Sequence, residues 1–318
     1  MMPLLKILED DYALKIDHIR LISYTHHQVY QAVDKDGGQW ILRLMQTYDP
    51  VHLDAEMQLL NFLAQETELL APVPKAHLEA LFWQEVHVED KVYALCVFHF
   101  LEGEVLQMDT LDVRMMGSIA TLLANLHQVT EGLVADLRMP DFDFSAILGL
   151  DSIYGSAASA FYLTRERQDL LAEMSQKVSD LQVKYQQERS IIHGDALLKN
   201  ILQQGDRLAL IDFEYSAKAW PLYDLSPLLW QMVSLGSVSA GLRESYVEAY
   251  TRVRSISVPA YEVDLMIALR HAASCLWLMA NDHNPHYLKR VPRLLTQRFS
   301  ELESFLETDR FERRPDAP

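Results

Sequence analysis

The stretch from Ile191 to Leu202, IIHGDALLKNIL, decides the fold of this chain. An apolar run enters the tripeptide His193–Asp195, and Asn200 follows five residues after the aspartate. Residues 201–213 then carry two short apolar segments around a Gly-Asp turn signal, which predicts a tight hairpin. That hairpin ends at Asp212, so the segment combines a polar loop with a pair of strands.

The hairpin brings an amide and a carboxylate to the same end. If its loop has three residues, Asn200 lies directly across from Asp212, and if it has two, the residues are offset by one position. Asp195 lies on the loop that leads into that end. Two carboxylates and an amide are the hard oxygen ligands that Mg²⁺ prefers. Taken singly, Asp195 could cap a turn and Asp212 could end a strand, but their joint order and spacing favour a site.

This set of residues is what phosphoryl transfer from ATP requires. A metal ion neutralises the charge on the phosphate oxygens, and an aspartate orients the attacking hydroxyl and accepts its proton. We therefore predict Asp195 as the catalytic base, with Asn200 and Asp212 as ligands of Mg²⁺.

The rest of the chain divides into a strand-rich part and a helical part. The first hundred residues predict five strands (17–23, 29–33, 39–45, 81–88 and 91–98) and one helix, 54–65. After Gly103 the apolar spacing becomes helical, over 110–129, 156–188, 221–235, 241–253, 261–280 and 285–307. The expected class is α+β, with a small antiparallel five-stranded lobe over residues 1–98, a hinge at 99–103 and a larger, mainly helical lobe over 104–318.

The segment from His193 through Asn200 to Ile211-Asp-Phe-Glu214 resembles the aminoglycoside phosphotransferase and choline kinase-like family. The resemblance extends over roughly residues 18–300 and is sharply specific only within 193–224. It implies a bilobal protein-kinase-like fold, with a nucleotide-binding first lobe and a second lobe for catalysis and substrate binding. It also implies that Asp224 holds the catalytic loop in place.

The same resemblance indicates which residues would bind the nucleotide. Kinase-like folds pair a cation on the third strand with a glutamate on the next helix, and Arg43 and Glu56 occupy these places. A carboxylate at the margin of an apolar helix face needs a cation, and Arg43 would then contact the α- and β-phosphates. The backbone around Phe100 and Leu101 would bind the adenine edge. The structural alternatives are a surface arginine, a solvated glutamate and a buried strand end.

Three features carry less information. The loop Ser23–Gln28 has no glycine where kinases carry several, so it is either a plain turn or a source of side-chain donors for phosphate. Lys199 is either a surface lysine or a ligand of the γ-phosphate. Substrate-selecting residues are expected within 145–188 and 236–285.

The composition restricts the partners. A formal charge of −17 disfavours binding to nucleic acid or to an anionic membrane. It would suit a cationic substrate, although an ordinary acidic cytoplasmic protein explains it equally well. Two distant cysteines do not form a disulfide framework, which fits a reducing cytosol. The longest apolar runs, 92–98 and 272–280, are too short to cross a bilayer, and the first residues lack the pattern of a signal peptide.

We therefore predict an ATP- and Mg²⁺-dependent kinase of a small-molecule hydroxyl, in the manner of aminoglycoside, choline, homoserine or sugar kinases. One alternative is a protein Ser/Thr kinase, which is disfavoured because Glu214 replaces the usual glycine and no long activation segment precedes Asp224. The other is a nucleotide-binding pseudokinase that acts as a regulator, supported by Arg43 and the glycine-free loop.

Overall fold

The computed structural model describes residues 2–24, 27–88, 90–142, 144, 148, 161–236, 239–282 and 289–312. The chain forms two compact units. Unit 1 comprises Met1–Val105, Ala135–Pro140 and Asn200–Ser216, and unit 2 comprises Leu106–Val134, Asp141–Lys199 and Ala217–Pro318. The hairpin that carries Asn200 and Asp212 thus belongs to unit 1, whereas all residues from 104 onward were expected to form one lobe.

The centre of unit 1 is an antiparallel five-stranded sheet in the order β1-β2-β3-β5-β4, as predicted. Its strands are β1 (Ile16–Tyr24), β2 (Gln28–Asp34), β3 (Gln39–Met45), β4 (Trp83–Val88) and β5 (Lys91–His99). The turn between β2 and β3 is tied by Asp34, whose carboxylate accepts hydrogen bonds from the Gly38 amide and the Trp40 indole. These bonds fix the register of β3, on which Arg43 lies.

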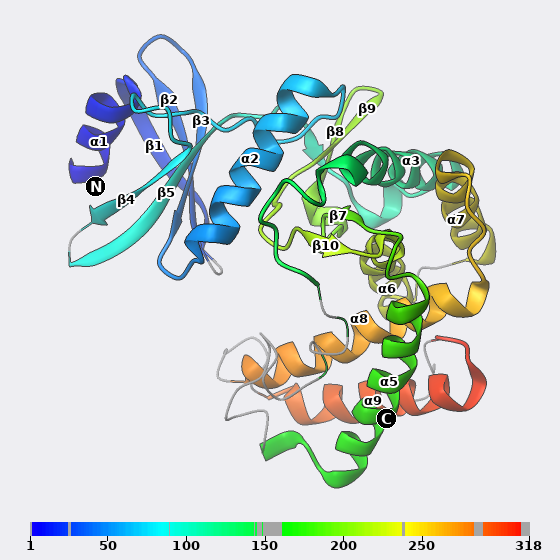
Figure 1. Ribbon diagram of the computed structural model, residues 1–318. Helices are drawn as coiled ribbons and strands as arrows, with labels where there is room; N and C mark the ends of the chain where they lie inside the picture. The colour runs from blue at the N-terminus through cyan, green and yellow to red at the C-terminus, as the bar shows by residue number, and fades with distance from the viewer. Residues whose placement is uncertain are drawn as a thin grey trace. The chain divides into compact units, whose positions relative to one another are not determined.

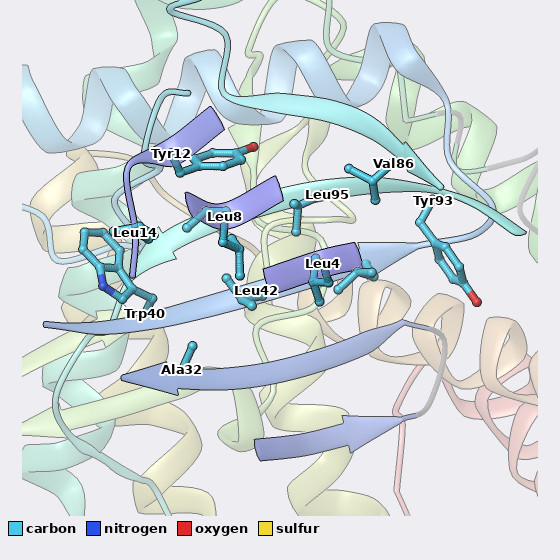
Figure 2. Packing of buried hydrophobic residues seen from close by; sticks show 12 residues of the cluster. Leu4, Leu8, Tyr12, Leu14, Ala32, Trp40, Leu42, Val86, Tyr93 and Leu95 are labelled. Carbon is cyan, nitrogen blue, oxygen red and sulfur yellow. The ribbon is translucent and has the colours of Figure 1, made fainter. Parts of the chain in front are cut away.

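Two helices cover opposite faces of this sheet, α1 (Met2–Tyr12) and α2 (Pro50–Glu66) (Figure 1). Helix α1 was not predicted from the sequence. Its residues Leu4, Leu8 and Tyr12 recur every four positions and form one apolar stripe. Figure 2 shows this stripe packed on the sheet, where the alternating residues Trp40 and Leu42 of β3 point toward it. The opposite face of β3 is thereby left to α2.

The hairpin of unit 1 consists of β8 (Ile201–Gln204) and β9 (Arg207–Leu210), with β6 (Glu104–Val105) on the other side of β8. Gln204 pairs with Arg207, so the loop has two residues, and Asn200 lies across from Ile211 rather than Asp212. Backbone bonds join β9 to the segment before β4: the Leu210 amide donates to the Leu70 carbonyl. These bonds explain why the hairpin groups with the N-terminal sheet.

Unit 2 is mainly helical, as expected. Helix α3 packs along α7, and α8 packs along α9 (Figure 1). The predicted helix over 221–235 is divided into a 3-10 turn, η5 (Pro221–Leu225), and α6. Strands β7 (Ser190–Ile192) and β10 (Ala217–Ala219) pair antiparallel, and β10 was not predicted. The helices are α3 (Val113–Thr130), α5 (Arg165–Lys184), α6 (Ser226–Ser234), α7 (Ala240–Arg254), α8 (Ala260–Ala280) and α9 (Val291–Thr308).

Helix α8 is long and apolar enough to span a bilayer by length and composition, which the short uninterrupted run 272–280 did not indicate. Within the described part of the chain, 78% of its most apolar window is buried inside the fold. Helix α8 is therefore the core helix of unit 2. Arg270 interrupts its apolar sequence near the middle.

The packing of α1 on the sheet predicts a large effect of Leu8→Ala. Leu8 is fully buried, so removing its side chain leaves a cavity and should lower the free energy of unfolding by about 2–5 kcal/mol. Urea denaturation measures this change. Leu78→Ala is the matched control, because Leu78 is 71% exposed and should lose well under 1 kcal/mol. Equal losses in both variants would contradict the packing of α1 described here.

Candidate active site

A loop in unit 2 leads from β7 through His193 and Gly194 to Asp195, and Asp224 holds it in place. The Asp224 carboxylate accepts hydrogen bonds from the amides of His193 (2.6 Å) and Gly194 (2.8 Å). Gly194 has φ +81°, a conformation that costs other residues energy. The glycine therefore allows the chain to turn sharply just after these two amides, on its way to Asp195. This is the loop-holding role that the resemblance implied for Asp224.

Asp224 is fully buried and has a third partner. His127 on α3 contributes its Nε2, 2.9 Å from the same carboxylate, and its Nδ1 lies 2.8 Å from the Tyr250 hydroxyl. Burial alone would raise the pKa of Asp224. The hydrogen bond to His127, the electrostatic attraction of His127 and the hydrogen bond from the His193 amide outweigh burial, and together they hold the pKa below its usual value. Asp224 is thus ionised and tied to α3 as well as to the loop.

The side chain of Asp195, the predicted base, is held between two cations. The residue is 5% exposed, and its amide donates to Nδ1 of His193 at 3.3 Å. Arg270 Nη2 lies 2.5 Å from Oδ1, and Lys199 Nζ lies 3.3 Å from Oδ2. Lys199 is 61% exposed, so its contribution is small, whereas the Arg270 side chain is largely buried.

Arg270 was not identified from the sequence. It comes from α8 and lies over the Trp230 ring, 5.6 Å from the centroid. The signal was available, because a lone arginine inside a long apolar helix needs a carboxylate partner. The pattern of α8 alone could not show that this partner is Asp195, which is 75 residues away in the sequence.

Unit 1 holds the two residues predicted to bind metal. The Asn200 carbonyl accepts from the amide of Ile211 at 2.9 Å, and Asp212 follows directly. Asp212 has φ +67°, and a left-handed conformation at a residue other than glycine is uncommon and often marks a functional position. This turn ends β9 before the residues 211–213 that were predicted to extend it.

The donor set fits a magnesium ion that shares its shell with a nucleotide. An amide oxygen and a carboxylate oxygen suit Mg²⁺, which usually takes one or two protein carboxylates together with phosphate oxygens. Across the described ranges, no group of three or more His, Cys, Asp or Glu residues could hold a metal by itself. A cage made only of protein side chains is therefore not what these residues form.

The predicted pairing of Arg43 with Glu56 is confirmed. Nη1 and Nη2 of Arg43 donate to the two carboxylate oxygens of Glu56 at 2.9 and 2.7 Å, and the residues are 7% and 2% exposed. Burial alone would lower the pKa of Arg43, but the Glu56 carboxylate outweighs it and holds the pKa well above its usual value. Nε of Arg43 has no partner among the described residues, which leaves one donor beyond the fork.

Two further contacts concern the expected nucleotide side of unit 1. His27, at the end of the glycine-free loop, lies 2.7 Å from the carboxylate of Glu214, so this loop does carry a polar side-chain contact. Thr25 and His26 of the loop lie outside the described residues. The amide of Phe100 donates to the Gln39 carbonyl at 3.0 Å, so this N–H cannot serve adenine. The Phe100 carbonyl and the Leu101 backbone are the candidates in its place.

Comparison with known proteins identifies the family of the chain. Residues 18–260 match the APH family, described as the phosphotransferase enzyme family. The chain therefore belongs to the phosphotransferase enzyme family, and the class of protein that its fold and site define is a kinase-like transferase. No curated protein sequence matches the chain.

Solved structures share the fold at low sequence identity. A microcompartment-associated aminopropanol kinase is 18% identical, with a TM-score of 0.79 over 99% of this chain and 100% of its own. The amicoumacin kinase hAmiN, in complex with AMP-PNP, Ca²⁺ and Ami, is 14% identical, with a TM-score of 0.76 over 97% and 94%. A choline/ethanolamine kinase family protein from Mesorhizobium loti is 17% identical, with a TM-score of 0.61 over 92% and 88%.

The environment of Asp224 predicts a pH-dependent effect of Asp224→Asn. At neutral pH the substitution should lower the free energy of unfolding by about 3–5 kcal/mol, because it breaks a buried charged network. The folded-state pKa lies below the ordinary 3.8, so the stabilisation is complete above that value and is lost as the pH falls through the folded-state pKa. Urea unfolding at several pH values measures the difference in the free energy of unfolding between the variant and the wild type.

This difference should narrow as the pH drops below about 4. Asp169→Asn, at an exposed position of α5, is the control and should change little at any pH. A difference that stays constant down to pH 3 would contradict an ionised Asp224.

The buried fork between Arg43 and Glu56 predicts non-additive substitutions. Glu56→Gln leaves the guanidinium buried without its countercharge and should cost about 3–5 kcal/mol. The double variant Arg43→Met with Glu56→Leu removes both charges, and it should unfold within about 1 kcal/mol of the wild type. Chemical denaturation of the single and double variants tests this. Additive losses would show that the two side chains do not depend on each other.

Proposed function

We propose that this protein transfers the γ-phosphate of Mg·ATP to a hydroxyl group of a small molecule. The observation that carries the proposal is the clamp of Asp224 on the His193–Asp195 loop, which presents a carboxylate at a fixed place in a phosphotransferase. Phosphoryl transfer depends mainly on positioning and electrostatics, so a fixed loop is the feature that this chemistry requires.

Asp195 serves as the base in this proposal. Its carboxylate accepts the proton of the acceptor hydroxyl while the acceptor oxygen forms a bond to the γ-phosphorus and the bond to ADP breaks. Clamping by Asp224 supports this role, because the loop backbone cannot turn Asp195 away. The carboxylate itself is held by side chains, and their hydrogen bonds can be exchanged for a bond to substrate.

In unit 1, the oxygens of Asn200 and Asp212 are the proposed ligands of Mg²⁺. The ion supplies charge neutralisation on the phosphate oxygens when it is bound. Arg43 is the proposed ligand of the α- and β-phosphates, with Glu56 fixing its guanidinium plane. The Phe100 carbonyl and the Leu101 backbone are proposed to bind the adenine edge. The amicoumacin kinase structure, which holds AMP-PNP and Ca²⁺, supports a nucleotide with a divalent ion in this fold.

The acceptor is proposed to be a small molecule rather than a protein. Aminopropanol, amicoumacin and choline or ethanolamine kinases share the fold, and the segment between Asp212 and Asp224 leaves no room for a long activation loop. A cytoplasmic location, where ATP is available, completes the proposal.

Asp195→Asn should reduce acceptor-dependent ADP formation by at least about 10²-fold, because the amide cannot accept the proton. Its affinity for Mg·ATP should be unchanged. Asp212→Asn should instead weaken Mg²⁺-dependent nucleotide binding. A coupled ADP assay over a panel of hydroxyl compounds, together with calorimetric titration of Mg·ATP, measures both effects.

Asp169→Asn is the control and should match the wild type in both assays. Full turnover by Asp195→Asn would contradict the proposed base. Nucleotide binding without any phosphate transfer would favour the pseudokinase alternative, and transfer of labelled phosphate to general protein substrates would favour a protein kinase.

A further inference from the structure

The carboxylate of Asp195 meets cations at both of its oxygens. Arg270 contacts Oδ1 at 2.5 Å and Lys199 approaches Oδ2 at 3.3 Å. A third cation, Arg298 of α9, lies on the same indole as Arg270, with its guanidinium 5.9 Å from the Trp230 centroid. Among the described residues, two cations therefore meet the single carboxylate of Asp195, in a chain whose net charge is −17.

Three buried acidic residues of α8 and α9 have other partners among the described residues. Asp264 binds Arg243 at 2.9 Å. Glu262 binds Lys184 at 2.6 Å, and Glu301 lies 3.2 Å from His271. The carboxylates Glu244 and Glu248 are exposed on α7, which packs on α3.

The placement of Arg270 bears directly on the acceptor. A hydroxyl that donates to Asp195 must lie within hydrogen-bond reach of its carboxylate, so the neighbouring atoms of the acceptor lie near the guanidinium. An ammonium group there would be repelled by Arg270 and Lys199, whereas a carboxylate would find the planar fork of donors that arginine offers. The guanidinium of Arg270 also lies over the Trp230 ring, 5.6 Å from its centroid.

We propose that the acceptor is a hydroxycarboxylic acid, and that Arg270 binds its carboxylate. This inference rests on the proposed function and reverses the cationic substrate that the overall charge suggested. On binding, the acceptor carboxylate replaces Asp195 on the Arg270 fork, and Oδ1 becomes available to the hydroxyl. The acceptor proton then passes to Asp195, the acceptor oxygen bonds to the γ-phosphorus, and ADP leaves.

The replacement of Asp195 by the acceptor carboxylate on Arg270 also limits the size of the acceptor. Hydrogen bonds of about 2.7–2.9 Å to Asp195 and to Arg270 place the hydroxyl and carboxylate oxygens roughly 4–6 Å apart. A chain of two to three carbons between the two groups covers that distance. A base that is released only when the carboxylate is bound would also limit the transfer of phosphate to water.

The experiment compares three compounds of equal length by calorimetric titration of the intact protein. γ-Hydroxybutyrate, γ-hydroxybutyramide and 4-aminobutanol share a terminal hydroxyl and differ only in carrying a carboxylate, an amide or an ammonium. The hydroxy acid should bind at least tenfold more tightly than the other two. Arg270→Gln should remove this preference, and Arg270→Lys, which keeps the charge and loses the fork, should retain part of it.

Arg252→Gln, at an exposed position of α7, is the control and should leave all three affinities unchanged. Thermal midpoints of the variants show whether they are folded. The preference of the wild-type protein for the hydroxy acid over the other two compounds tests the inference without any variant. Equal binding of the three compounds, absence of hydroxy acid binding, or tighter binding of the amino alcohol would each overturn it.

Two further outcomes separate this inference from the proposed function. If Arg270→Gln weakens Mg·ATP binding and leaves the hydroxy acid unaffected, Arg270 serves a nucleotide phosphate and the inference fails while the kinase stands. If the hydroxy acid binds through Arg270 but no hydroxyl compound is phosphorylated, the anion site is supported and the proposed function fails.

Discussion

The buried carboxylate of Asp224 is the interaction on which the catalytic loop depends. It joins three parts of unit 2 by fixed hydrogen bonds: two successive loop amides, His127 of α3 and its own turn η5. Each bond involves a charge in a low-dielectric interior, where an unmatched carboxylate would be costly. The conformation of Gly194 directs the chain from these two amides to Asp195. The glycine of the HGD sequence is therefore required by the geometry of the loop.

The two aspartates of the loop system differ in what binds them. Asp224 is held by backbone amides and a buried histidine, which cannot leave without unfolding the loop. Asp195 is held by the side chains of Arg270 and Lys199, which can change partners. Only the carboxylate of Asp224 is therefore fixed by backbone and buried groups. In unit 1, the carboxylate of Glu56 is fixed in a similar way, because it is buried against Arg43.

The sequence was most informative where local pattern and chemistry coincide. The strand predicted at 39–45 forms as β3, with Trp40 and Leu42 packed toward α1 and Arg43 paired with Glu56 of α2. Helix α1 was missed because eleven residues carry only a short apolar stripe, and its partner is a distant sheet. The sequence did not decide whether Asn200 lies directly across from Asp212 or one position away. A three-residue and a two-residue hairpin loop were both compatible with it. Arg270 could not be assigned because pairing across 75 residues depends on tertiary structure, which periodicity does not encode.

The central proposal is that the loop held by Asp224 presents Asp195 for phosphoryl transfer to a hydroxyl. The most direct test is ³¹P NMR of the protein incubated with Mg·ATP and short hydroxycarboxylic acids. A phosphate monoester resonance should grow in step with ADP. Formation of inorganic phosphate alone, or stable ATP in the presence of every hydroxyl compound tried, would contradict it.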